Sequence, residues 1–123
     1  MIVDAHHHYW DPARGDYGWL ARTSPLHRRW TPDDLRPLMA DAGVQATILV
    51  QAAPTMAETD WLLDLAEQDP GVLGVVGWLD LDAPDVAGRL RQRRPRGLIG
   101  IRPMLQDIAD TDWILAPARH AGL

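Results

Sequence analysis

The amino-acid sequence predicts an α/β fold in which four short strands form one parallel sheet. Short apolar runs alternate with amphipathic segments along the whole chain, and some of these runs are uninterrupted, which is typical of strands covered on both faces. Such an alternation implies right-handed crossovers between parallel strands. The length of 123 residues, with 46% apolar and 24% charged residues, suits a single globular domain spanning residues 1–123.

Charge and cysteine content exclude several classes of function. A formal net charge of −5 argues against a nucleic-acid-binding surface, which needs a basic face. The sequence has no cysteine, so any metal must be bound by His, Asp or Glu. It shows no signal peptide and no apolar stretch approaching the ~18 residues of a membrane span, so we expect a cytoplasmic protein without a membrane partner.

The chain begins with a short strand that is followed by a long loop. Residues 1–5 form an apolar run that predicts a strand ending near Asp4. Residues 11–30 hold Pro, Gly, Asp and Ser at irregular spacing, together with two tryptophans and Tyr17. An ordered loop of this length inside a compact domain is usually functional.

Helix and strand signals then alternate to the end of the sequence. Residues 31–43 predict a helix with Thr31 as its N-cap and Gly43 as its stop signal, and Pro37 predicts a kink or an earlier end. The arginines between 89 and 96 fit the solvated face and last turn of a later helix. The remaining segments predict strands over 44–52, 72–81 and 98–105, and helices over 55–71, 83–97 and 110–123.

Two architectures fit this order of elements. One is a small open, doubly wound sheet, and the other is the first half of an eight-fold βα barrel, which typically needs ~250 residues. The length of the chain favours the open sheet. The motifs at the strand ends favour the barrel.

Three consecutive histidines follow the first strand. In an extended backbone residues i and i+2 project to the same side, so His6 and His8 can converge on one ion while His7 points elsewhere. Open catalytic zinc sites use three protein ligands and a water, so two histidines are an incomplete set. One alternative is that the two histidines are a surface pair or a satisfied pair that binds no metal. The other is a purification tag, which is disfavoured because the triplet directly follows a predicted strand. The strand-end position favours the metal site, because parallel α/β folds build their sites there.

Several motifs together resemble the N-terminal part of the amidohydrolase superfamily. The segments VDAHHHYWDP, GDYGWL, ILVQAAPTMAETDWLLDLA, GVVGWLDL and GLIGIRPMLQD occur in the expected order and cover nearly all of the chain. They are most similar to the sugar-lactonase branch, which contains L-fuconolactonase and L-rhamnonolactonase, and more distantly to 2-pyrone-4,6-dicarboxylate lactonase. The resemblance implies the N-terminal half, (βα)4, of a TIM-type (βα)8 barrel with parallel strands.

The resemblance also implies roles for residues at the strand ends. His6 and His8 match the HxH pair that faces the catalytic mouth, which implies one divalent metal with zinc as first candidate, although metal-independent lactonases occur in the superfamily. Arg102 matches the arginine of a GIRH pattern at the end of the fourth strand, with Pro103 in place of the histidine. Arginine stays protonated and cannot bind a metal, so Arg102 speaks against a two-metal centre and suits a substrate carboxylate or oxyanion.

Three further residues are candidates for substrate binding. Gln51, at the end of the second strand, fits either a hydrogen-bond partner of a sugar hydroxyl or a polar cap of the strand end. Trp10 and Trp19 fit the walls of a sugar pocket, but packing of the long loop onto the barrel rim is the favoured interpretation.

The expected function is hydrolysis of a sugar lactone by attack of water on the lactone carbonyl. The resemblance implies that the general base lies on a strand outside this chain, so the catalytic residues stay unassigned. Alternatives are a decarboxylase of the same superfamily and a catalytically silent half barrel. A half barrel exposes the edges of its first and fourth strands, so we expect either self-association or a missing C-terminal half.

Overall fold

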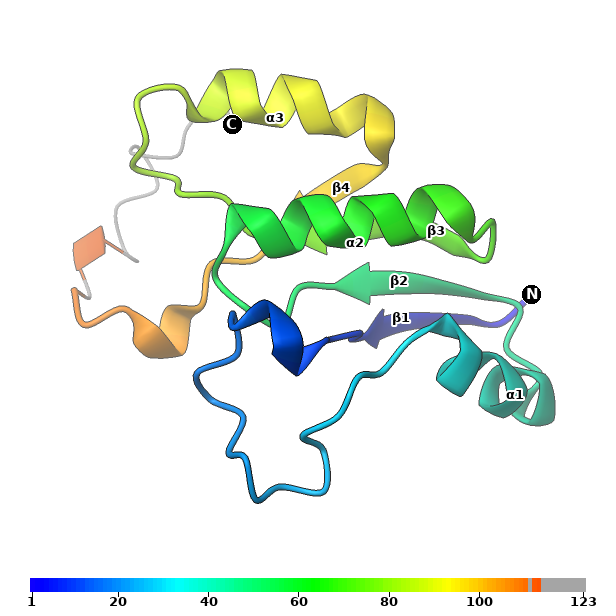
Figure 1. Cartoon of the computed structure of the whole chain (residues 1–123). Helices are drawn as coiled ribbons and strands as arrows, with labels where there is room; N and C mark the ends of the chain where they lie inside the picture. The colour runs from blue at the N-terminus through cyan, green and yellow to red at the C-terminus, as the bar shows by residue number, and fades with distance from the viewer. Residues whose placement is uncertain (111, 114–123) are drawn as a thin grey trace.

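The computed structural model describes residues 1–110, 112 and 113 and confirms the predicted parallel α/β fold. One sheet holds four strands in the order β1-β2-β3-β4, all neighbours parallel: β1 (Val3–His7), β2 (Ala46–Val50), β3 (Val72–Gly77) and β4 (Leu98–Ile101). The connecting helices are α1 (Pro32–Ala42), α2 (Met56–Gln68) and α3 (Val86–Arg93), with 3-10 turns at Pro12–Arg14, Arg94–Arg96 and Leu105–Asp107 (Figure 1). No described helix has the length and apolarity to cross a bilayer. The helix predicted over 110–123 lies largely outside the described residues.

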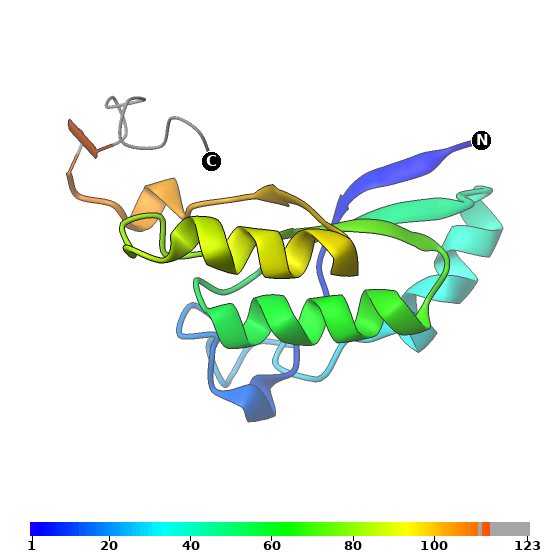
Figure 2. The ribbon, with the colours of Figure 1, turned by 90° about the horizontal axis from the view of Figure 1, so that it is seen from above.

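All three helices pack against the same face of the sheet. Leu62 of α2, Val86 of α3 and Leu35 of α1 join one apolar cluster with residues of β2, β3 and β4. Figure 2 shows α2 and α3 on one side of the strands. The prediction of strands covered on both faces is confirmed for β2, in which no residue is exposed. It is wrong for β3 and β4 within the described residues, because Leu73 and Ile99 are 52% and 59% exposed.

Helix α1 begins and ends at the predicted residues. Thr31 is the N-cap, reinforced by hydrogen bonds to the Asp34 carboxylate, and Gly43 ends the helix in the left-handed conformation at φ 68°. Pro37 does not shorten it. The missing N–H of Pro37 frees the carbonyl of Asp33, and both residues are exposed, so water can satisfy that carbonyl.

The first turn of α2 is tied to the end of β3. The Thr59 hydroxyl is fully buried, accepts the backbone N–H of Trp78 and donates to the Trp78 carbonyl, both at 2.8 Å. The strand ends at Gly77, where an added Cβ would lie 2.5 Å from the Thr59 methyl group. Glycine is therefore required at that position because the helix approaches the strand so closely.

Two of the arginines after residue 88 form ion pairs with helix α2. Arg93 forms a two-pronged pair with Asp60 of α2, with both N–O distances 2.8 Å and the Arg93 side chain 12% exposed. Arg96 pairs with Asp64 and Glu67 of the same helix. The prediction that the run supplies the last turn of the helix is confirmed for Arg93. The prediction of a solvated face is wrong for Arg93 and Arg96, because both pair with acids of α2.

Candidate functional site

The two candidate metal ligands lie side by side at the carboxyl end of β1. The strand continues to His7, three residues beyond the predicted end. As the period of an extended strand predicts, His6 and His8 project together, and their Nε2 atoms are 3.2 Å apart. His7 is buried on the other side of the strand, edge-to-face with the Tyr9 ring at 4.7 Å.

A backbone contact determines which nitrogen of His8 carries the proton. His8 Nδ1 is 2.8 Å from the carbonyl oxygen of Val50 at the end of β2. A carbonyl can only accept, so Nδ1 must donate and the Nε2 lone pair is left facing His6. Burial lowers the pKa of His8, and the nearby His6 and Arg102 add to this, while the hydrogen bond to Val50 opposes it. The neutral ring that a metal requires is therefore favoured.

The spacing of the two rings fits one tetrahedral ion. Two nitrogens that bind the same zinc at 2.0–2.1 Å lie about 3.3 Å apart when the angle between them is tetrahedral. The observed 3.2 Å between the Nε2 atoms of His6 and His8 is close to this value. Within residues 1–110, 112 and 113, no third His, Asp or Glu completes a cluster with them.

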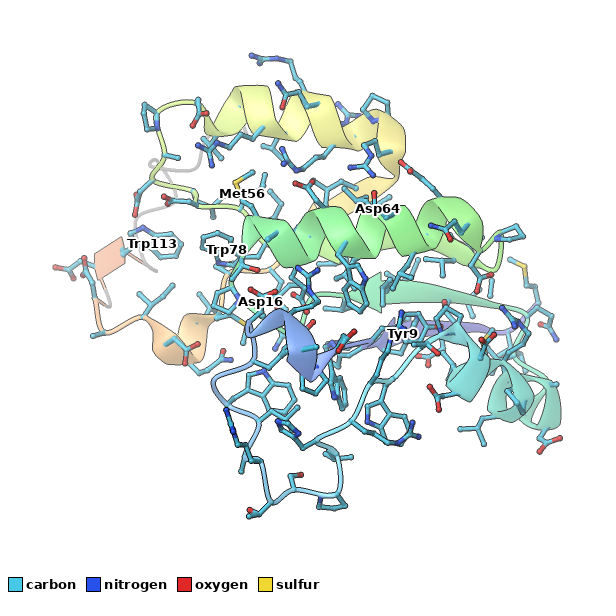
Figure 3. The ribbon with its side chains drawn as sticks, in the orientation of Figure 1. Tyr9, Asp16, Met56, Asp64, Trp78 and Trp113 are labelled. Carbon is cyan, nitrogen blue, oxygen red and sulfur yellow. The ribbon has the colours of Figure 1, made fainter. Side chains whose placement is uncertain are left out.

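A pocket of about 620 Å³ opens beside His8 at the carboxyl ends of the strands. Its walls come from the end of β1, the long loop, the β2–α2 connection and the segment after β4. Four of the predicted site residues line it, namely His8, Trp10, Trp19 and Arg102. The lining also includes residues that the sequence did not indicate: Asp16, Ala52, Met104, Gln106 and Asp107. Asp16 lies near the start of α2 (Figure 3) and pairs with Arg14 at 3.0 Å.

Arg102 follows β4 and is one of the residues that line the pocket. Its backbone N–H donates to the Gly77 carbonyl, which continues the pairing of β4 with β3, and its Nη1 donates to the Gln51 carbonyl at 3.3 Å. Among the described residues no carboxylate forms an ion pair with Arg102, unlike Arg89 and Arg93 of α3. The remaining donors of its fork are therefore available to an anionic or carbonyl oxygen.

Gln51 lies beneath the pocket and outside its lining. The side chain is fully buried, and its Nε2 donates to the Arg102 carbonyl at 2.9 Å and to Met104 Sδ at 3.1 Å. This arrangement matches the alternative interpretation of Gln51 as a polar cap, because it joins the end of β2 to the segment after β4. The Oε1 atom of Gln51 is buried without a hydrogen-bond partner among the described residues, so the interpretation of Gln51 as a partner of a sugar hydroxyl stays a prediction.

Trp19 and Trp30 of the long loop, together with Trp10 just before it, hold the loop in place, and Trp10 and Trp19 also line the pocket. Trp10 and Trp30 both donate their indole N–H to the Leu26 carbonyl, at 3.1 and 3.2 Å. Trp19 donates to the Ala52 carbonyl at 2.8 Å, and its ring centroid is 5.7 Å from that of Trp10. The favoured prediction of loop packing is confirmed. The pocket-wall interpretation stays a prediction, and it is compatible with loop packing because Trp10 and Trp19 are both lining residues of the pocket and Trp19 is 52% exposed.

Glu58 is a feature of this region that the sequence analysis missed. It is fully buried in the first turn of α2, and its carboxylate accepts the backbone N–H groups of Ala52 and Ala53. Burial raises the pKa of Glu58, while the N–H groups of Ala53 and Ala52 oppose that change. The available signal was the T-x-x-E pattern from Thr55 to Glu58, which indicates a capping box but not a buried carboxylate.

Comparisons with known proteins place these features in a family context. The amidohydrolase family model matches residues 3–119. An L-fucono-1,5-lactonase from Burkholderia ambifaria is 48% identical over 120 residues, which is 94% of this chain and 40% of the relative. An L-fucono-1,5-lactonase from Burkholderia multivorans is 42% identical over 111 residues, which is 89% of this chain and 38% of the relative.

Solved structures show the same partial coverage. A crystal structure of an amidohydrolase from Burkholderia multivorans with bound zinc has a TM-score of 0.87 and 38% identity, over 98% of this chain and 43% of that protein. A probable 2-pyrone-4,6-dicarboxylic acid hydrolase from Acinetobacter baumannii, with citric acid bound, has a TM-score of 0.65 over 97% of this chain and 45% of that protein. At 17% identity it shows the fold alone. The chain spans 38–40% of the length of the two lactonases.

Proposed function

The chain belongs to the amidohydrolase family, and from this premise we propose that it forms the first part of a hydrolase that opens a sugar lactone. The two lactonases that are 48% and 42% identical to it support an aldonolactone such as L-fucono-1,5-lactone as the substrate. The observation that carries the proposal is the pocket at the strand ends, where His8, Arg102 and two indole rings surround one space. Its volume of about 620 Å³ lies within the range of small-molecule sites, roughly 300–1,000 Å³.

We propose that His6 and His8 bind one divalent ion in this site. Zinc is the first candidate, because an amidohydrolase 38% identical to the chain carries bound zinc. The spacing of the two rings and the proton on Nδ1 of His8 support the proposal. An ion held there supplies Lewis-acid polarisation of the lactone carbonyl and a water of lowered pKa.

Arg102 is the proposed anchor for oxygen atoms of the ligand. Its planar fork of donors suits the carbonyl oxygen as negative charge develops on it, and then the carboxylate of the hydroxy-acid product. Because the Gln51 carbonyl holds one Nη1 hydrogen, the guanidinium is oriented before a ligand arrives. In a metal-independent reaction, the alternative within the family, Arg102 carries this stabilisation by itself.

We propose that further polypeptide completes the barrel in the active protein. The exposed Leu73 and Ile99 side chains mark an apolar sheet face that no described helix covers, and a soluble protein rarely leaves such a face open. The two lactonases are about two and a half times as long as the region they share with this chain, which favours additional strands over a second copy. The general base is proposed to lie on those strands. A stable dimer of the 123-residue chain in sedimentation experiments would overturn this preference.

A chimera tests the proposed activity without assuming that the chain acts alone. The chain replaces the matching 120 residues of the Burkholderia ambifaria lactonase, and hydrolysis of L-fucono-1,5-lactone is followed by acid release above the spontaneous rate. We expect the chimera to turn over the lactone and His8→Asn to lower that turnover by about 10²-fold or more. Changing a residue that only hydrogen-bonds a metal ligand can already cost about 10²-fold, and His8→Asn removes the ligand itself. The matched control is His27→Asn in the long loop.

The outcome separates the proposals from their alternatives. A folded chimera without lactone turnover, whose zinc content equals that of the lactonase, would exclude the proposed substrate for this chain. Turnover that survives His6→Asn and His8→Asn would instead exclude the metal site and leave the metal-independent reaction. Turnover by the 123-residue chain itself would overturn the proposal that further strands supply the base.

A further inference from the structure

The β2–α2 connection is bound by one buried carboxylate. Glu58, with no exposed surface, accepts the backbone N–H of Ala53 at 2.8 Å and that of Ala52 at 3.1 Å through Oε2, with Oε1 3.2 Å from the Ala52 nitrogen. The helix orients Glu58, because the Thr55 hydroxyl caps its backbone N–H at 3.0 Å. Tyr17 of the long loop lies against the same carboxylate.

The same connection holds two side chains of the pocket. The Gln51 carbonyl accepts from Arg102 Nη1 at 3.3 Å, and the Ala52 carbonyl accepts from Trp19 Nε1 at 2.8 Å. The Gln51 carbonyl and the Ala52 N–H belong to one peptide group. The Ala52 carbonyl and the Ala53 N–H belong to the next.

The geometry of the peptide bond couples the two sets of contacts. A trans peptide group is planar and directs its N–H and its C=O in opposite directions, and the described chain has no cis peptide. Glu58 holds the N–H end of both groups, so it also determines where their carbonyl oxygens point. Hydrogen bonds at the two ends of a peptide group also polarise each other, which strengthens both.

We propose that Glu58 is a positioning residue of the pocket: it orients the two peptide groups whose carbonyls hold Trp19 and Arg102, and thereby sets the pocket's width. It acts from behind the pocket and does not line it. The inference concerns the pocket of the proposed function but does not depend on the reaction, since it follows from the contacts of the chain by itself.

The test compares Glu58→Gln with Glu67→Gln in the 123-residue chain. The control makes the same chemical change on the same helix, at a residue whose carboxylate pairs with Arg96 at the surface. The readout is hydrogen exchange at the indole N–H of Trp19, measured by NMR and assigned by its loss in Trp19→Phe. The internal references are the indoles of Trp10 and Trp30, which donate to Leu26 instead.

We expect Glu58→Gln to accelerate exchange at the Trp19 indole by about ten-fold relative to the Trp30 indole, the equivalent of one neutral hydrogen bond such as that from Trp19 to the Ala52 carbonyl. The guanidinium of Arg102 should also react faster with phenylglyoxal, as measured by peptide mass spectrometry. Glu67→Gln should change neither. Equal acceleration at all three indoles would show that Glu58 stabilises the fold generally, and an unchanged Trp19 indole would show no coupling; either result overturns the proposal.

A measurement on the unaltered chain covers the case in which Glu58→Gln does not fold. The hydrogen bond from Ala53 predicts a scalar coupling between the Ala53 nitrogen and the Glu58 carboxylate carbon, transmitted through the bond. Its absence in a folded chain with a slowly exchanging Trp19 indole would show that Trp19 is held without Glu58, which also overturns the proposal. Neither arm requires lactone turnover, so a failure here is distinguishable from a failure of the proposed function.

Discussion

Mild acid should destabilise the protein through His7, the middle histidine of the triplet. The ring is 9% exposed and packs edge-to-face on Tyr9. Burial lowers the pKa of His7 from 6.5 to about 4. The carboxylates of Asp4 and Asp69 act in the opposite direction, and the charges of His8 and His6 add to the effect of burial, but each contributes less than burial does.

The sign and size of the effect follow from proton linkage. Between pH 6.5 and 4 the unfolded chain protonates this histidine while the folded chain keeps it neutral, so the unfolded state binds more protons and stability falls as the pH falls. Above pH 6.5 His7 is neutral in both states, and the stability that depends on its neutral form is fully present. Each pKa unit corresponds to about 1.4 kcal/mol, so the free energy of unfolding should drop by about 3 kcal/mol by pH 4.

Urea unfolding at a series of pH values, with a chelator present to exclude metals, measures this drop. The His7→Gln variant removes the titrating group, so its profile between pH 6.5 and 4 should be flatter by about 3 kcal/mol than that of the unaltered chain. A smaller dependence of the unfolding free energy on pH should persist in His7→Gln, because burial also lowers the pKa of His8. His27→Gln is the matched control, and parallel profiles for the unaltered chain and His7→Gln would refute the reasoning.

Three further predictions concern the α2 contact, the metal and the pocket. Thr59→Val keeps the shape of the side chain but leaves the N–H and C=O of Trp78 unpaired, so it should lower the free energy of unfolding by about 2 kcal/mol. Thr59→Ser keeps the hydroxyl and should lower it by only about 1 kcal/mol. Urea midpoints in the reverse order would count against the contact. Zinc affinity measured by equilibrium dialysis should fall at least about ten-fold in His8→Asn but not in His27→Asn, and equal affinity would remove His8 from the ligand set. In the chimera, Arg102→Lys should lower kcat/KM for the lactone by about 10²-fold, because an ammonium group cannot replace the fork of donors, and an unchanged value would exclude Arg102 as the oxygen anchor.

Local signals were sufficient for most of the elements and for part of the site. The cap at Thr31 and the stop at Gly43 predicted α1 to the residue, because capping depends on groups within one turn. The two-residue period of a strand predicted that His6 and His8 converge. The contacts of Glu58, and the choice between the two interpretations of Gln51, could not be predicted in this way, since the groups that they contact belong to other segments of the chain.

The sequence by itself determined the order of strands and helices, the convergence of two imidazoles at a strand end and the family resemblance, since each depends on neighbours along the chain. Tertiary structure alone decided that Asp16 and Met104 join the pocket while Gln51 does not line it. It also decided which face of the sheet the helices cover and which arginines pair with acids. These outcomes depend on contacts between segments as far apart as Gln51 and Arg102. The physical reason is that a side chain's hydrogen-bonding partners are set by the packing of whole elements, so residue type and position along the chain do not specify them.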